Sequence, residues 1–257
     1  MRTFVRAFLT ELRCRIFSLN FAVPVIIVTA GYIASMYQER RAPEDIIYFW
    51  DLVQNIGYFT SLSILSCTAL NCTAFLNDYR SDYYRSSVIR SGKRNYTLSK
   101  FLACIIAGGL TLFLGAMFFI LILSFRYPFV LPETVDQYSH AVEFDFRGIL
   151  LRDGHYFGLY ALLGFMAFLF GALWSAVGIC VSAFITDRYV ASFSPYVIWY
   201  TFRGLLPGKF RTEIVFHGHY NFGGVGGSIL FAVVYFGLII AAMGVIFCIK
   251  AGRRCEN

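Results

Sequence analysis

The sequence predicts an all-α integral membrane protein with six transmembrane helices, an N-terminal amphipathic interfacial helix, a short cytoplasmic helix between the second and third spans, and both termini in the cytoplasm. Three observations predict this class. The 257-residue chain is 58% hydrophobic and only 14% charged, which is too apolar for an ordinary soluble domain. Apolar runs long enough to cross a bilayer alternate with short charged segments. Basic residues gather in alternate connections, which is the pattern that orients membrane proteins.

The N-terminal region predicts an interfacial helix that leads into the first span. Residues 1–15 place apolar side chains at helical spacing among four arginines. The apolar run 16–37 contains 22 residues, which suits a membrane span better than a signal peptide. Pro24 is expected to kink it. The connection 38–51 is acidic on balance and is expected outside.

The second span, 52–77, carries no charge but has one polar face. Small polar side chains recur along it at three- and four-residue steps, and these are Thr60, Ser63, Cys67 and Asn71. Polar stripes inside membranes usually serve helix packing, and the alternative is that this stripe lines a substrate path.

The connection 78–100 is strongly basic, with six Lys and Arg against two acidic residues, so it is expected in the cytoplasm. Its pattern is also helical. Asp78 comes early and Arg85 and Arg90 come late, which complements a helix dipole, and Gly92 is a natural stop. Two interpretations follow: a contact helix for a cytoplasmic partner, or a solvated basic loop near anionic lipid headgroups.

The remaining spans differ in strength. The third, 101–125, is uncharged, and the fourth, 157–185, has a stripe of small residues that predicts a tight helix interface. The fifth, 189–206, is weak, because Pro195 interrupts it and Arg203 must snorkel outward. Such a segment often leads into re-entrant backbone. The sixth span is 228–249, and the later outer segments are 126–156 and 207–227.

Hydroxyl groups on the fifth span could contribute to a substrate path or anchor the helix at the interface. They belong to Ser192, Ser194, Tyr196 and Tyr200.

Charge counting supports the orientation. Inner segments collect fourteen Lys and Arg against five Asp and Glu, and outer segments collect eight against ten. Both termini are therefore expected in the cytoplasm. None of the seven cysteines falls in an expected outer segment, which argues against a disulfide framework.

The usual catalytic motifs are missing from the sequence. There is no phosphate-binding Gly-x-x-x-x-Gly-Lys-Ser/Thr loop, no His-Glu-x-x-His and no Gly-x-Ser-x-Gly, so neither an enzyme nor an ATP-driven motor is expected in this chain alone. His217 and His219 could supply two metal ligands, but without a third nearby a surface role is favoured. We expect no catalytic, cofactor or metal site. The net charge of +7 comes without a nucleic-acid motif, so nucleic acid is not an expected partner.

The helical layout and the stretch YRSSVIRSGKRNYTLSKFL, from Tyr84 to Leu102, resemble the membrane subunit of type-2 ABC exporters, the ABC-2 type permease family. In such permeases an amphipathic coupling helix lies between the second and third spans and is followed by a basic turn. The weak fifth span and the glycine-rich return before the sixth also resemble the re-entrant outer helices of that family.

The resemblance implies a function. The chain would be a permease subunit of a bacterial plasma membrane that moves a hydrophobic or amphipathic substrate such as a peptide, antibiotic or lipid. Two separate ATPase subunits would bind ATP and Mg²⁺, and a second permease subunit, identical or related, would complete the transporter within the lipid. The implied coupling residues are Asp78, Tyr79, Asp82, Tyr83, Tyr84, Arg85, Val88 and Arg90. The alternative is a membrane-embedded enzyme or ATP-independent scaffold that acts through its outer segments.

Overall fold

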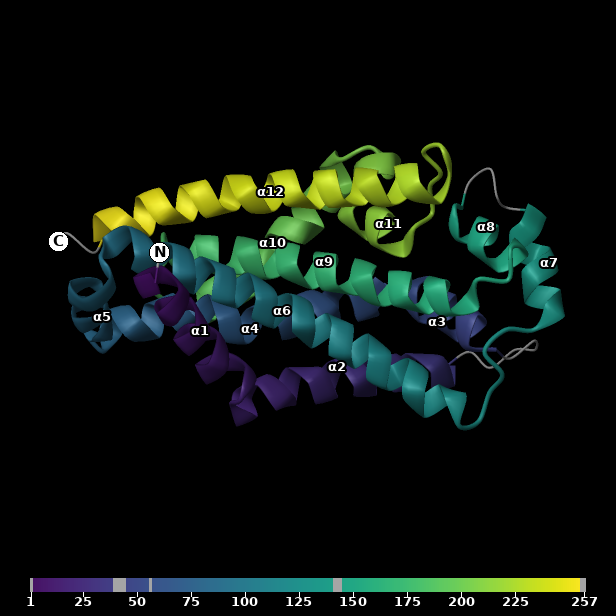
Figure 1. The fold of residues 1–257 in the computed structure, drawn as a ribbon, viewed down its shortest axis with the longest axis horizontal. Coiled ribbons are helices and arrows are strands. Elements are labelled where there is room, and N and C mark those ends of the chain that lie inside the picture. The colour runs from purple at the N-terminus through teal and green to yellow at the C-terminus, as the bar shows by residue number, and fades with distance from the viewer. Residues whose placement is uncertain (1, 39–44, 56, 141–144, 255–257) are drawn as a thin grey trace.

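The computed structural model describes residues 2–38, 45–55, 57–140 and 145–254, and the regular structure within these ranges is entirely helical. Long helices run side by side in an elongated bundle (Figure 1). They are α2 (Leu19–Gln38), α4 (Gly57–Arg80), α6 (Lys93–Ser124), α9 (Tyr156–Ser182), α10 (Arg188–Leu205) and α12 (Gly224–Arg254). The shorter elements are α1 (Arg2–Ile16), α3 (Ile46–Asn55), α5 (Tyr83–Ser91), α7 (Pro132–His140), α8 (Arg147–Arg152), η1 (Gly208–Phe210) and α11 (Thr212–His217).

Five helices among the described residues are long and apolar enough to cross a membrane, namely α2, α4, α6, α9 and α12. They match five of the six expected spans, and their length and composition are compatible with a multi-pass membrane protein. The expected fifth span does form a helix, α10, but α10 is not one of the five. Its 18 residues include Arg188 and Arg203 as well as several hydroxyl side chains, which lower its hydropathy.

Helix α9 forms the centre of the bundle and contacts α4, α6, α10 and α12. Of its most apolar stretch 83% is buried, compared with 17% for α12, whose exposed apolar surface suits contact with lipid. The expected small-residue interface is present. A Cβ atom at Gly171 would lie 2.5 Å from the Gly108 carbonyl oxygen, so only glycine permits this approach of α9 to α6.

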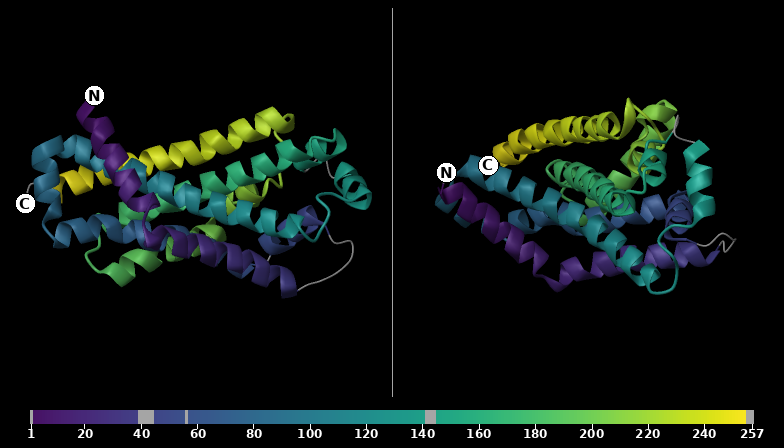
Figure 2. Two further views of the ribbon diagram at one scale, coloured as in Figure 1. Left: turned by 60° about the horizontal axis from the view of Figure 1, so that its bottom comes forward. Right: turned by 45° about the vertical axis from the view of Figure 1, so that its right-hand side comes forward.

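The two ends of the bundle carry different elements (Figures 1 and 2). The start of α1, the short helix α5 and the C-terminal end of α12 lie together at one end, here called the α5 end. Helices α3, α7, α8 and α11 lie at the other, here called the α3 end. Helix α10 starts near the α5 end, where the Arg80 guanidinium donates to the Thr186 carbonyl at 2.7 Å, and leads the chain toward α11.

Several expected boundaries differ from the structure. The connection 78–100 is almost wholly helical, because α4 continues to Arg80 and α6 already begins at Lys93. Part of the expected outer loop 38–51 is α3, and residues 39–44 lie outside the described part of the chain. Helix α3 forms because its apolar face is buried, with Trp50 stacked on Tyr32 at 5.4 Å between ring centroids.

Candidate functional site

Helix α5 is set apart from its long neighbours by a sharp turn at each end. Asp82, just before it, has a φ of +55°, and Gly92, just after it, has a φ of +80° and donates its N–H to the Val88 carbonyl at 2.8 Å. Left-handed backbone is unfavourable for most residues and free of cost for glycine, so Gly92 ends the helix as the sequence predicts. Helix α5 is therefore a separate nine-residue helix that connects α4 to α6.

The inner face of α5 is anchored to the bundle. Tyr84 is buried and stacks on Tyr79 of α4, with ring centroids 5.3 Å apart. Val88 packs against the same hydrophobic cluster. These three expected coupling residues therefore lie toward the bundle, where they connect α5 to α4.

The outer face of α5 is formed by Tyr83, Arg85, Ile89 and Arg90, all exposed. Ile89 is 85% exposed and Tyr83 is 52% exposed, so this face presents apolar surface beside its two arginines. Arg85 forms an exposed ion pair with Asp82 at 3.3 Å, and such pairs contribute little stability. A hydrogen bond to the Tyr84 hydroxyl, and then the charge of Asp82, raise the pKa of Arg85, so this face keeps its charge.

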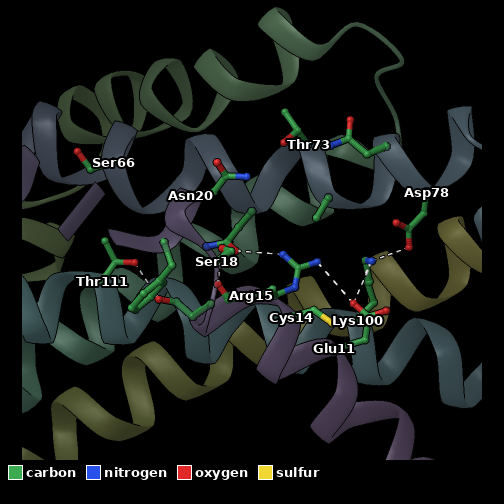
Figure 3. Close-up of a pocket in the computed structure, with 15 residues that line it drawn as sticks. Glu11, Cys14, Arg15, Ser18, Asn20, Ser66, Thr73, Asp78, Lys100 and Thr111 are labelled. Atoms are coloured by element: carbon green, nitrogen blue, oxygen red, sulfur yellow. Dashed lines mark hydrogen bonds and ion pairs between the residues drawn. The ribbon is translucent and has the colours of Figure 1, made fainter. Parts of the chain in front are cut away.

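Asp78 has a different position from the other expected coupling residues. Its Oδ2 lies 2.5 Å from Lys100 Nζ and accepts a hydrogen bond from the Tyr96 hydroxyl at 2.8 Å. Lys100 is only 4% exposed and also reaches Glu11 Oε2 at 3.0 Å. This buried cluster, here called the Lys100 cluster, links α1, α4 and α6 directly behind α5 (Figure 3).

A polar pocket of about 270 Å³ lies beside the Lys100 cluster, between α1, α2, α4 and α6 (Figure 3). Arg15 extends along it, with Nη1 3.4 Å from Asn71 Oδ1 and Nη2 3.9 Å from Glu11. Two basic and two acidic side chains line the pocket, so its charges balance. Its uncharged polar lining includes Ser18, Asn20, Ser66, Asn71, Thr73, Asn77 and Thr111.

The polar stripe of the second span is buried. Two of its four residues, Cys67 and Asn71, connect α4 to α9 through hydrogen bonds. The Asn71 amide donates to Ser175 Oγ at 3.2 Å, and Ser175 Oγ in turn donates to the Cys67 carbonyl at 2.9 Å. Thr60 and Ser63 are buried farther along α4. These contacts favour the packing interpretation of the stripe, and Asn71 alone among its four members also lines the polar pocket.

The hydroxyl groups of α10 do not converge with that stripe. Ser192 and Ser194 donate to the carbonyl groups of Arg188 and Val190 in their own helix. Tyr196 is half-buried with its ring 5.8 Å from that of Trp199, and Tyr200 is exposed. The four polar side chains of α4 and the four hydroxyl side chains of α10 therefore form two separate groups and do not line one common path.

A second charged cluster lies at the α3 end, around a buried arginine. Arg147 contacts Asp145 at 2.5 Å and Asp51 at 2.7 Å, and its Nη2 lies 3.2 Å from His219 Nδ1. Burial raises the pKa of Asp51, and the charge of Arg147 opposes that effect. Burial alone would raise the pKa of Asp145 as well. Hydrogen bonds with His219 and Arg147 have the larger effect, so the pKa of Asp145 is lowered. The cluster joins α3, α8 and the segment after α11.

His217 and His219, considered together as metal ligands, have separate environments. His217 is buried, and burial lowers its pKa to about 3, so its imidazole is neutral. His219 takes part in the Arg147 cluster. Within the described ranges no group of three His, Cys, Asp or Glu side chains is arranged to hold a metal ion.

Sequence reasoning missed the Lys100 cluster. In the sequence Lys100 belongs to the basic connection 78–100, and Glu11 stands among the arginines of the N-terminal helix. A lone acidic residue in a basic helix is the one local signal that points to an internal partner.

Comparison with known protein families, with curated proteins and with solved structures finds no match to this chain. Its function must therefore be inferred from its own residues.

Proposed function

We propose that this chain is the permease subunit of an ATP-driven ABC exporter in the plasma membrane. It would cross the membrane six times, with α10 as the fifth span, and its α5 end would face the cytoplasm. Two copies, or this chain and a related one, would pair with two ATPase subunits that bind ATP and Mg²⁺. The substrate class is a hydrophobic or amphipathic molecule.

The observation that carries the proposal is helix α5. It is a short helix at the end where both chain termini lie, and it presents Tyr83, Arg85, Ile89 and Arg90 while Tyr84 anchors it. The exposed Tyr83 and Ile89, with Arg85 and Arg90 beside them, would fit a groove on a partner protein that has an apolar floor and an acidic rim.

The contacts behind α5 support a mechanical role. Tyr84 stacks on Tyr79 of α4, and the Lys100 cluster fastens α6 to α4 and α1. A displacement of α5 by a partner would therefore reach three helices through buried contacts that are closely packed. Hydrolysis in the partner could in this way change the access of a site between the helices.

The orientation is supported by charge. The basic segments 1–15 and 78–100 and the basic end of α12 belong to the α5 end, and the acidic residues Asp45, Asp51 and Asp145 belong to the α3 end. Positive charge on the cytoplasmic side is the general rule for membrane proteins.

The proposal is tested by purifying the full-length chain from its native membrane and sequencing the proteins that accompany it. We expect an ATPase with a phosphate-binding loop, at one ATPase per permease chain. The double variant Arg85→Glu and Arg90→Glu, combined with Tyr83→Ala, should lose this partner because the partner surface must be acidic. Arg126→Glu, an exposed charge change near the opposite end of α6, is the matched control and should retain it.

Transport provides the second readout. The α5 variant should fold as the wild type does, since its three changes are exposed, yet it should uncouple ATP hydrolysis from substrate movement. A chain that purifies alone with full activity, or an α5 variant with unchanged partner and transport, would contradict the proposal.

A further inference from the structure

A cavity of about 420 Å³ lies between α9, α10, α11 and α12, away from the polar pocket. Its volume suits a small organic molecule, and its walls are mainly aliphatic and aromatic. The apolar lining includes Leu173, Trp174, Val177, Ile198, Phe202 and Met243. Such a composition indicates an apolar occupant, with specificity determined by the few polar groups present.

One acidic side chain faces this cavity. Glu213 of α11 is only 8% exposed, and its Oε2 accepts a hydrogen bond from Trp199 Nε1 at 3.1 Å. Its Oε1 lies 3.2 Å from Nε of Arg203. A carboxylate so deeply placed requires a cation or several donors beside it. Trp199 orients this carboxylate, and Arg203 supplies the cation.

Arg203 is a replaceable cation. Its side chain is 43% exposed, and its guanidinium carbon lies 5.4 Å from the centre of the Trp199 ring. The guanidinium thus occupies a position defined by the Glu213 carboxylate and an indole face, the two groups that recognise organic cations. Because Arg203 is 43% exposed and lies in the last turn of α10, its long side chain can extend away from this position at a lower cost than a fully buried cation could.

Another lining residue, Trp174 of α9, carries a hydrogen-bond donor. The Nε1–H of Trp174 is buried and has no hydrogen-bond partner in the described part of the chain. A buried indole N–H normally finds an acceptor. An ether, carbonyl or hydroxyl oxygen on a bound molecule would satisfy it.

We propose that this cavity binds a hydrophobic molecule with one cationic group, whose ammonium or guanidinium replaces the Arg203 guanidinium between the Glu213 carboxylate and the Trp199 ring. The apolar part of the molecule occupies the cavity along α9 and α12. The inference that this molecule is the cargo depends on the proposed function, whereas the binding itself does not. A lipid acyl chain is the competing occupant, and it would make no use of Glu213.

The test uses the purified full-length chain in lipid nanodiscs without any ATPase. Two of the three tryptophans, Trp174 and Trp199, line the cavity, so bromine-quenched tryptophan fluorescence reports its occupancy. The probes are bromohexyltrimethylammonium, its neutral analogue bromohexanol and its anionic analogue bromohexanoate. We expect saturable quenching by the cation at a concentration about tenfold lower than for the neutral probe, as for an organic cation held beside a carboxylate and an indole face.

Two variants of opposite effect sharpen the test. Glu213→Gln should abolish the preference for the cation. Arg203→Gln should strengthen binding of the cation roughly threefold or more, because it removes the internal competitor. Glu133→Gln, an exposed acidic residue of α7, is the matched control and should change neither value.

Equal quenching by the three probes would overturn the inference and identify a lipid-chain groove. Weaker cation binding in Arg203→Gln would overturn it as well, and this exposed substitution is expected to fold even if Glu213→Gln does not. Cation binding in a chain that never associates with an ATPase would leave the cavity assignment intact and refute the permease proposal alone.

Discussion

Replacing Lys100 by methionine tests whether the Lys100 cluster stabilises the packing behind α5. The substitution preserves an unbranched side chain of similar length but removes the charge. The carboxylates of Asp78 and Glu11 lie 2.5 and 3.0 Å from Lys100 Nζ in the wild type. The substitution leaves Asp78 without its cation and leaves Glu11 with Arg15 alone, at 3.9 Å.

The magnitude follows from burial. Removing one partner of a buried ion pair typically costs 3–5 kcal/mol, mainly because the remaining charge is uncompensated. The side chains of Asp78 and Glu11 are 15% and 18% exposed, so some hydration remains to them. We therefore expect a loss of about 3 kcal/mol in the free energy of unfolding, near the lower limit of that range.

The assay is denaturation of the full-length chain in mixed micelles, followed by circular dichroism. Arg94→Met is the matched control, since Arg94 is an exposed basic residue of the same helix, and it should change the free energy of unfolding by less than about 0.5 kcal/mol. Adding Asp78→Asn to Lys100→Met should recover at least about 1 kcal/mol, because one uncompensated charge is removed. Equal stability of Lys100→Met and Arg94→Met would refute the reasoning.

Two further predictions concern the helix interface and the α3 end. Gly108→Ala should destabilise the chain by about 1–3 kcal/mol in the same denaturation assay, because its Cβ would lie 1.6 Å from Ser175 Oγ. Gly204→Ala, which meets open space, is the control, and equal effects of the two would contradict the packing. Burial lowers the pKa of His217 from 6.5 to about 3 in the folded chain. As the pH falls below 6.5, the unfolded chain therefore binds a proton at this histidine that the folded chain does not bind. The stabilisation should be fully present above pH 6.5 and should decrease below it. The loss should reach on the order of 2 kcal/mol by about pH 5, and a His217→Gln variant with the same pH profile would count against this assignment.

Local features of the sequence were sufficient for the class of fold and for the existence of α5. Apolar runs of span length can be satisfied only as helices in a membrane, whatever their neighbours are. The break at Gly92 also depends on local backbone, because the left-handed conformation there is available to glycine at no cost. The predicted end of α5 at Gly92 matches the observed helix Tyr83–Ser91, whereas the expected start at Asp78 is wrong, because α4 continues to Arg80.

Charge is a poor guide to the boundaries of the helices in this chain. The basic residues of 78–100 suggested a long connection, yet Lys93 and Lys100 lie within α6. Lysine is compatible with a helix when its charge is paired or reaches water. The helix α3 was missed for a related reason, since its acidic neighbours concealed an apolar face that is buried in the bundle.

What the sequence by itself determined is that this chain is helical, that its helices are long and apolar enough to span a membrane, and that one short basic helix lies between two of them. These properties depend on run length, composition and the conformational demands of single residues. Only the tertiary structure decided that Lys100 is buried against Asp78 and Glu11, that Asn71 binds Ser175, and that Glu213 faces an apolar cavity with Trp199. Most of these partners are far apart in the chain, and which faces of the helices meet is settled by the packing of the whole bundle.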